Sequence, residues 1–318
     1  MSMIGSESDQ NFIIEVNGLT KRYGQLLAVD GISFKVRKGE FFGFLGPNGA
    51  GKTTTVRMLT GVIKADAGNA LIMGFRSGSL KSKQMTGVIP ETANAYGDLS
   101  ALDNMMLMAK LYGVPSIEAK KRSSDYLQAL GLLERSGSLV RTYSKGMKQR
   151  LVLAMALISD PEVLFLDEPT SGLDVQSARL MKDLLRDLNA RGKTVFLTTH
   201  NMDEASQLCD RVAIINKGKI VVVDAPERLR MAISGRNSIE VSFSDGVDPD
   251  ALKQLQGVNA VEKVGDRYRL YTDNPGELVT KLSEYSCAAG VKIVSLNTLA
   301  PSLEDAFVAL TGKEDEHA

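Results

Sequence analysis

The stretch of the chain best suited to chemistry is a run of eight residues, Gly46-Pro47-Asn48-Gly49-Ala50-Gly51-Lys52-Thr53. Its spacing fits G-x-x-x-x-G-K-[ST], the P-loop pattern, and Thr54 follows it directly. The glycines let the backbone curl so that successive N–H groups form a nest for an anion. Lys52 can then reach the β- and γ-phosphates, and the Thr53 hydroxyl can ligate Mg²⁺. We therefore predict a triphosphate site, because a plain glycine-rich turn would not explain the terminal lysine and threonine.

Two neighbouring acids form the second chemical feature. Asp167 and Glu168 end the apolar run Val163 to Leu166, which is typical of a buried parallel strand. Carboxylates at the C-terminal end of such a strand lie where an open α/β sheet binds its ligands. We predict that Asp167 is a second magnesium ligand and that Glu168 polarises a water molecule against the γ-phosphate. The alternative is a solvated strand end, although the loop that follows carries one more acid, Asp174.

His200 and Ser144 give weaker signals. His200 is one of only two histidines and follows the apolar strand predicted over residues 193–199. A lone histidine is more often structural, but one at the end of the neighbouring strand is placed to touch phosphate. Ser144 precedes the apolar helix predicted over residues 151–158 and can serve as its N-cap. The start of that helix therefore offers a second positive dipole end for an anion.

Strands and helices must bring these residues together. The apolar run 40–45 predicts a strand that leads into the P-loop, and apolar residues about one turn apart predict a helix over 53–63. Together these patterns predict an α/β fold with a mixed sheet, an antiparallel β edge at the start and a helical subdomain at about 98–160. The other predicted elements are strands at 12–16, 31–36, 193–199, 211–216 and 219–223, helices that begin at Ser100 and Ser116, and a helix at 175–190.

A second, smaller domain is predicted after about residue 225. Its order is β-α-β-β-α-β, which is ferredoxin-like, with a closing helix from Ser302. It carries no catalytic cluster, so a dimer-steadying or regulatory module is favoured over a second active site, with ligand binding as the alternative. The predicted layout is a disordered tail at 1–11, a triphosphate-binding domain at 12–224, an α+β accessory domain at 225–311 and an acidic tail at 312–318.

Composition excludes several classes of function. The 318 residues carry 38 Lys+Arg and 38 Asp+Glu, so neither a nucleic-acid footprint nor a basic membrane patch is indicated. Cys209 and Cys287 match no metal or redox spacing, which favours a reduced, cytoplasmic compartment. No apolar run approaches the roughly 18 residues of a membrane span, and the N-terminal segment does not read as a signal peptide.

Taken in order, these motifs resemble the ATP-binding subunit of an ATP-binding-cassette (ABC) transporter over about residues 12–230. Lys145 in the signature, where many members have glycine, is similar to the drug-exporter (ABC-2-like) branch, and Glu91 stands where the Q-loop glutamine is usual. The family's motifs fall on Walker A at Gly46 to Thr53, the adenine-stacking aromatic at Tyr23, the signature at Tyr143-Ser144-Lys145-Gly146-Met147, Walker B at Val163 to Asp167, the catalytic glutamate at Glu168, the D-loop at Ser171-Gly172-Leu173-Asp174 and the switch histidine at His200.

The resemblance implies ATP hydrolysis with Mg²⁺, in which Lys52, Glu168 and His200 are catalytic and Thr53 and Asp167 hold the metal. It also implies a homodimer that sandwiches two ATP molecules, with the signature of one subunit facing the γ-phosphate bound to the other. The solute would pass through a separate integral-membrane permease docked near residues 91–99, and export is the expected direction. The chain would then lie at the cytoplasmic face of the membrane as a peripheral subunit, with no nucleic-acid partner.

Three other functions compete. A P-loop kinase would not require Glu168 or the signature. A soluble ABC-type switch acting on ribosomes or DNA would be expected to show tandem cassettes or a long coiled-coil insertion. A non-hydrolysing interaction protein is the third alternative, because Glu91 places an additional negative charge near the metal and the γ-phosphate.

Overall fold

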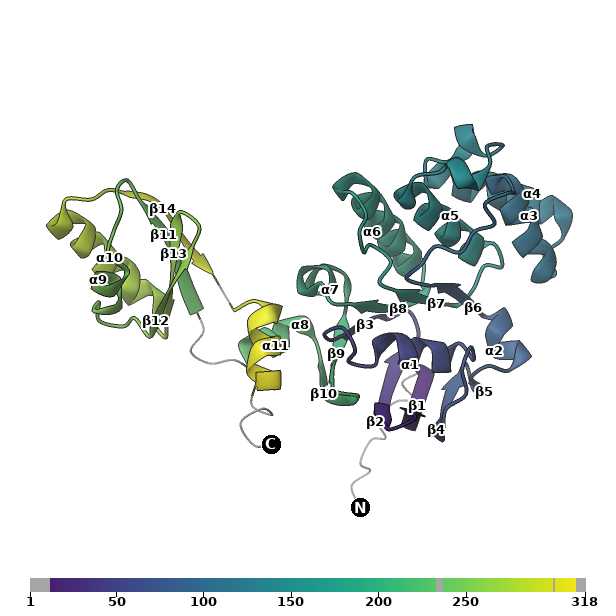
Figure 1. Cartoon of the computed structure of the whole chain (residues 1–318), viewed down its shortest axis with the longest axis horizontal. Helices are drawn as coiled ribbons and strands as arrows, with labels where there is room; N and C mark the ends of the chain where they lie inside the picture. Colours follow the sequence, from purple (N-terminus) through teal and green to yellow (C-terminus); the bar gives the residue numbers. More distant parts are fainter. Residues whose placement is uncertain (1–11, 233–236, 300, 313–318) are drawn as a thin grey trace, which may run out of the picture. The chain divides into compact units, whose positions relative to one another are not determined.

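The structure is a computed structural model that describes residues 12–232, 237–299 and 301–312. The chain divides into two compact units, Met1–Ala225 and Pro226–Ala318 (Figure 1). The predicted tails at 1–11 and 312–318 lie outside the described residues, except for Gly312, which ends a helix.

The first unit is organised around a six-stranded sheet in the order β10-β9-β3-β8-β7-β6. Neighbouring strands from β9 to β6 pair in parallel, and β10 pairs antiparallel with β9. The C-terminal ends of β3, β8 and β7 therefore lie side by side at one edge of the sheet, where open α/β sheets bind ligands. The strands are β3 (Phe41–Leu45), β6 (Thr86–Ile89), β7 (Val163–Asp167), β8 (Thr194–Thr199), β9 (Arg211–Asn216) and β10 (Lys219–Asp224).

A second, antiparallel sheet in the first unit has the order β2-β1-β4-β5. The alternation predicted around Ile32, Phe34 and Val36 is confirmed, because all three side chains are buried on one face of β2. The first two strands are longer than predicted, and the short pair that completes the sheet was not predicted at all. The strands are β1 (Phe12–Tyr23), β2 (Leu26–Arg37), β4 (Ala67–Ile72) and β5 (Phe75–Arg76).

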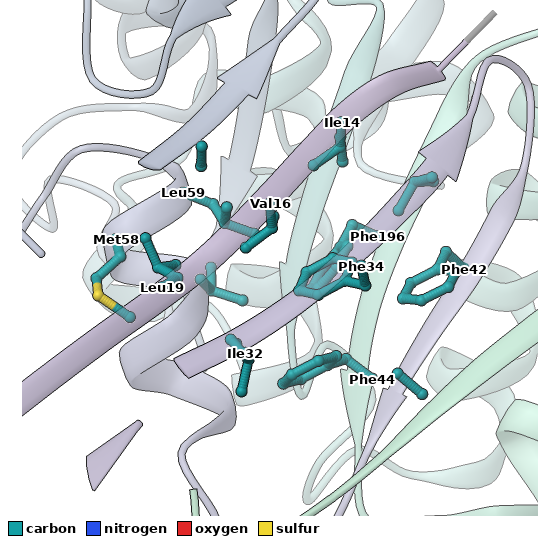
Figure 2. Close-up of a cluster of buried hydrophobic side chains, with 14 of the residues drawn as sticks. Ile14, Val16, Leu19, Ile32, Phe34, Phe42, Phe44, Met58, Leu59 and Phe196 are labelled. Carbon is teal, nitrogen blue, oxygen red and sulfur yellow. The ribbon is translucent and has the colours of Figure 1, made fainter. Parts of the chain in front are cut away.

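Aromatic side chains join the two sheets in a shared core (Figure 2). Phe34 of β2 stacks on Phe42 of β3, with ring centroids 5.6 Å apart, and lies 5.9 Å from the ring of Phe196 on β8. These rings are fully or nearly fully buried. One face of the strand that leads into the P-loop is thus fixed by apolar packing against β2 and β8.

The helix after the P-loop is shorter than predicted. It spans Lys52–Leu59 (α1), whereas the apolar spacing predicted a helix to residue 63. Gly61 has a positive φ of 69°, and the N–H groups of the next two residues both donate to the carbonyl oxygen of Arg57. Such a left-handed glycine is a common helix terminator. Ile63 and Ala65, beyond this glycine, pack against the core without being helical.

The predicted helical subdomain is confirmed as α3, α4 and α5. The capping box at Ser100 is present, because its hydroxyl accepts the Asp103 N–H at 3.0 Å. No helix among residues 12–232, 237–299 and 301–312 is long and apolar enough to span a membrane. The helices of the first unit are α1, α2 (Leu80–Gln84), α3 (Ala101–Leu111), α4 (Ser116–Ala129), α5 (Lys145–Leu157), α6 (Val175–Ala190) and α7 (Met202–Leu208), with 3₁₀ turns at Leu133–Arg135 and Val140–Thr142.

The second unit contains the predicted ferredoxin-like arrangement, a four-stranded antiparallel sheet in the order β12-β13-β11-β14. It has its own apolar core, which includes Val241, Leu270 and Leu282. The elements are α8 (Pro226–Met231), β11 (Asn237–Phe243), α9 (Pro249–Lys253), β12 (Ala260–Val264), β13 (Arg267–Thr272), α10 (Pro275–Ala289), β14 (Ile293–Leu299) and α11 (Leu303–Gly312).

Candidate functional site

The P-loop connects the end of β3 to the start of α1 and is fastened to the strands beneath it. Gly51 has a φ of 107°, and a Cβ atom there would lie 2.5 Å from the carbonyl oxygen of Ala28, so only glycine fits. The carbonyl oxygen of Ala50 accepts the Gly218 N–H at 3.1 Å, and the Gly218 carbonyl accepts the Asp30 N–H at 2.9 Å. The loop therefore has a defined shape set by β2 and the β9–β10 turn.

The Lys52 ammonium lies inside the curve of this loop. Its side chain is 6% exposed, and Nζ donates to the carbonyl oxygens of Gly46 and Pro47 at 2.7 and 3.2 Å. It also lies 3.3 Å from Glu168 Oε1, an ion pair between two nearly buried groups. That oxygen accepts no hydrogen bond from the described residues, so an incoming phosphate would compete with a carboxylate for the lysine.

A cavity of about 520 Å³ opens over the P-loop, which is within the usual size of a small-molecule site. It brings together Tyr23, Glu91 and most of the predicted nucleotide-binding residues. Tyr23 ends β1 and is 46% exposed, so its ring is available to a ligand. Gly46 and Ala50 do not line the cavity. The residues that line it are Tyr23, Leu26, Ala28, Pro47, Asn48, Gly49, Gly51, Lys52, Thr53, Thr54, Glu91, Glu168, Ser171 and His200.

Thr53 and Asp167 present oxygen atoms to the same point. The Thr53 hydroxyl donates to Asp167 Oδ1 at 3.2 Å, and Asp167 ends β7 with 4% exposure. A hydroxyl and a carboxylate suit Mg²⁺, which takes few protein ligands and completes its shell with phosphate oxygens and water. The described residues contain no cluster of three or more acid, histidine or cysteine side chains able to hold a metal alone. The donor set therefore fits magnesium carried with a nucleotide.

Glu168 has an unusual backbone. Its φ is 51°, which is uncommon for a residue with a long side chain. The Glu168 N–H donates to both the carbonyl and the hydroxyl oxygen of Thr198, at 3.1 and 3.2 Å, and these hydrogen bonds stabilise the strained conformation. The side chain is 9% exposed, and Oε2 lies 2.8 Å from His200 Nδ1. A neutral His200 must carry its proton on Nδ1 to donate in this contact.

The predicted signature residues lie at the start of α5. Ser144 is confirmed as the N-cap, since its hydroxyl accepts the Met147 N–H at 3.2 Å, and Ser144 and Lys145 are exposed. Gly146 is buried against α6, where a Cβ atom would lie 2.7 Å from the Ser177 hydroxyl. The Lys145 ammonium lies against Gly172 of the same chain, where a Cβ atom would collide with it. That these residues face a nucleotide bound to a second subunit stays a prediction.

Asp174 is the N-cap of α6. Its carboxylate accepts the Ser177 N–H and the Ser177 hydroxyl, both at 2.8 Å. These hydrogen bonds hold the pKa of the Asp174 carboxyl below its usual value, and the bond from the Ser177 backbone N–H has the largest effect. The loop that carries this acid is therefore anchored at its far end by the helix that follows it.

Glu91 lies between two cavities. It lines the cavity over the P-loop and also a larger one of about 680 Å³. The larger cavity is walled by α1, β6, α3 and α5, with Val88, Tyr112 and Met155 among its lining residues. Burial raises the pKa of the Tyr112 hydroxyl. Glu91 itself is exposed in the irregular segment that follows β6, so its role in positioning water stays a prediction.

Three polar residues near the site, Thr170, Thr198 and Glu204, were not singled out from the sequence. Thr198 contacts both Asp167 and Glu168. Glu204 of α7 is 4% exposed and accepts the Thr170 hydroxyl at 2.8 Å, which ties α7 to the loop after β7. Only the repeated threonine before His200 offered a signal in the sequence, because polar side chains are unusual at the end of an apolar strand.

Two family models and named relatives match the chain. Residues 29–171 match the family model described as ABC transporter, and residues 225–311 match that of the ATP-binding protein DrrA1-3-like, C-terminal domain. The chain is 36% identical to the linearmycin resistance ATP-binding protein LnrL of Bacillus subtilis over 95% of this chain and 99% of that protein. It is 40% identical to the Nod factor export ATP-binding protein I of Burkholderia pseudomallei, over 95% and 97%.

Solved structures are also similar. An ATP-binding subunit of an ABC transporter superposes with a TM-score of 0.65 at 28% identity, covering 69% of this chain and 92% of that one. The cbiO1 protein of Clostridium perfringens, part of the cbiONQ ABC transporter complex, gives a TM-score of 0.62 at 26% identity, covering 69% and 90%.

Proposed function

The chain belongs to the family of ABC transporter ATP-binding subunits, and from that premise we propose that it hydrolyses ATP to drive the export of a solute through a separate membrane subunit. One observation carries the proposal. Lys52, Thr53, Asp167, Glu168 and His200 meet at the aligned C-terminal ends of three adjacent strands, β3, β8 and β7. Each has the chemistry that phosphoryl transfer to water needs.

The contacts support the following roles. The P-loop amides and Lys52 would hold the phosphates, and Thr53 and Asp167 would hold magnesium, which would neutralise negative charge on the phosphates. Glu168 orients or deprotonates the attacking water, and the His200 contact fixes the carboxylate while the rest of the imidazole can reach the γ-phosphate. Catalysis is then mostly positioning and electrostatic stabilisation, because the protein forms no covalent bond to the phosphoryl group.

ATP also acts as a link between two copies of the chain. The exposed Ser144 hydroxyl and the start of α5 form a helix N-terminus that favours an anion, while the chain's own P-loop already serves one nucleotide. We propose that Ser144, Lys145, Gly146 and Met147 of one subunit complete the site of the other, with Asp174 close by. Hydrolysis removes the shared γ-phosphate and releases the dimer.

The solute path lies in a partner protein. Relatives are named for linearmycin resistance and Nod factor export, which supports export as the direction of transport. We propose that an integral-membrane permease docks on the segment from Glu91 to Leu99, beside the larger cavity, and holds the chain at the cytoplasmic face of the membrane. The accessory domain at 225–311 would then steady the dimer or regulate it.

The test is phosphate release from purified chain supplied with Mg²⁺ and ATP, with no acceptor molecule present. Steady release supports an ATPase and argues against a kinase. Ser144→Arg should abolish ATP-dependent dimerisation on size exclusion while nucleotide binding to the monomer remains. Absence of phosphate release would overturn the proposed ATPase activity and leave a kinase or a non-hydrolysing binding protein. Retained dimers in the variant would count against the shared site.

A further inference from the structure

Thr198 lies beside the proposed metal site on the strand next to Asp167. The parallel pairing of β7 and β8 places Asp167 directly opposite Thr198. The Thr198 side chain is fully buried, with 0% exposure. A buried hydroxyl requires partners, and the partners it has are both parts of the proposed catalytic machinery.

The Thr198 hydroxyl joins two residues at once. It donates to Asp167 Oδ1 at 2.6 Å and accepts the Glu168 N–H at 3.2 Å. A threonine hydroxyl has one proton and two lone pairs, so both contacts can exist together. The short distance to Asp167 is typical of a charge-assisted hydrogen bond to a carboxylate.

We propose that Thr198 is a positioning residue for magnesium, which rests on the ATPase function proposed above. Its hydroxyl fixes the orientation of the Asp167 carboxylate and ties it to the strained backbone of Glu168. Thr53 also donates to Asp167 Oδ1, at 3.2 Å, but Thr53 is itself an expected ligand and cannot serve as a fixed support. Residues that orient a ligating group commonly control metal affinity without touching the metal.

The type of residue suits the role. A β-branched side chain has few allowed rotamers, so the direction of the Thr198 hydroxyl is well defined. Valine has the same shape without the hydroxyl, and serine has the hydroxyl without the methyl group. Thr194 provides a matched control, because it is also on β8 and 0% exposed, and its hydroxyl accepts the Gly39 N–H at 2.9 Å at the other end of the strand.

The experiment compares the full-length chain with Thr198→Val, Thr198→Ser and Thr194→Val. A non-hydrolysable ATP analogue is titrated calorimetrically in EDTA and then at increasing Mg²⁺, and Mn²⁺ binding is followed by electron paramagnetic resonance. Thr198→Val should need a roughly 10–100-fold higher Mg²⁺ concentration to reach half of the increase in nucleotide affinity. Its affinity in EDTA should stay within about twofold, since no nucleotide contact is removed. The serine variant and the Thr194 control should resemble the wild type.

Equal metal dependence in Thr198→Val and wild type would overturn the proposal. So would a serine variant as poor as the valine variant, because packing of the methyl group would then be responsible. Thermal unfolding without ligands shows whether each variant folds. If the valine variant does not fold, the metal dependence of Thr198→Cys is compared with that of Thr198→Ser, because a thiol is a weak hydrogen-bond donor and a hydroxyl is a strong one. Failure of the wild type to respond to metal would instead refute the ATPase function itself.

Discussion

At the scale of single residues, the Glu168 carboxylate is held between two basic groups, Lys52 at 3.3 Å and His200 at 2.8 Å. Lys52 also donates to two P-loop carbonyls, so it lies where phosphate is expected. Phosphate would draw Lys52 away from Glu168, and the carboxylate would then be left with His200 and the attacking water. The arrangement links phosphate arrival to release of the proposed base.

Glu168→Gln should lower steady-state phosphate release by roughly 10²–10⁴-fold while nucleotide binding is kept, because an amide cannot accept the proton of water. Release is measured at saturating ATP, and binding by calorimetry. Glu118→Gln, in a partly buried ion pair of α4, is the control and should have wild-type turnover. Unchanged release in the Glu168 variant would remove that residue from the catalytic role.

The two cysteines should differ sharply in reactivity. Burial, and after it the negative charge of Glu204, raises the pKa of the Cys209 thiol well above its usual value, whereas Cys287 is exposed. The thiolate is the reactive form, so a raised pKa means that Cys209 reacts only at higher pH or after unfolding. At neutral pH one thiol per chain should react rapidly with a disulfide reagent such as DTNB. The Cys287→Ser variant should show none, and a rapid thiol in it would contradict the assignment.

At the scale of elements, the sequence predicted strands and helices whose apolar pattern is regular, and it missed those fixed by tertiary contacts. The predicted bounds of α6 agree with the structure because Asp174 caps it and its apolar face is continuous. The short strands β4, β5 and β6 carry few apolar residues in alternation, and their pairing with distant strands decides their conformation. The end of α1 was misplaced because Gly61, rather than the apolar spacing, terminates the helix.

The distinction between local patterns and tertiary contacts also holds for the residues of the site. The P-loop and the acids at the end of β7 were predictable because their spacing is local. The contacts of Thr198 with Asp167 depend on strand register between segments about thirty residues apart, which a sequence pattern does not encode.

Asn104 shows how an element can hold a neighbouring loop. This buried residue of α3 accepts the Tyr96 N–H at 2.9 Å and donates to the Tyr96 carbonyl at 3.0 Å. It thereby fixes the segment in which docking of the permease is proposed.

Asn104→Ala should lower the free energy of unfolding by about 1–3 kcal/mol, because it removes both hydrogen bonds to the Tyr96 backbone, each worth about 0.5–1.5 kcal/mol. The Tyr96 amide should then exchange its hydrogen much faster, while nucleotide affinity is unchanged. Hydrogen exchange with mass spectrometry measures both the Tyr96 segment and, as an internal control, the amides of α4. Unchanged exchange at residues 95–97 would show that the segment is held by other contacts.

At the scale of the whole molecule, the two units have separate apolar cores, one centred on Phe34 and Phe196 and one on Val241 and Leu282. The residues proposed to bind nucleotide all belong to the first unit. Ligand binding stabilises the unit that holds the ligand by mass action.

Calorimetric unfolding of the full chain should therefore show two transitions, of which only one shifts with nucleotide. A non-hydrolysable ATP analogue with Mg²⁺ at 100 times its Kd should add about 2.7 kcal/mol to the first unit. Leu282→Ala should lower the other transition, since it leaves a cavity in the second core and costs about 2–5 kcal/mol. A single transition that moves as a whole in both experiments would show that the units unfold together.

The fastening of the P-loop to the β9–β10 turn and to β2 has a thermodynamic consequence for ligand capture. The Gly218 amide holds the loop at Ala50, and the Asp30 amide holds Gly218, so the loop loses little chain entropy when a triphosphate enters. Initial nucleotide capture by one subunit should therefore show a small heat-capacity change and an association rate set by diffusion and charge. The larger ordering cost would fall on the later step, when two subunits close around the nucleotide.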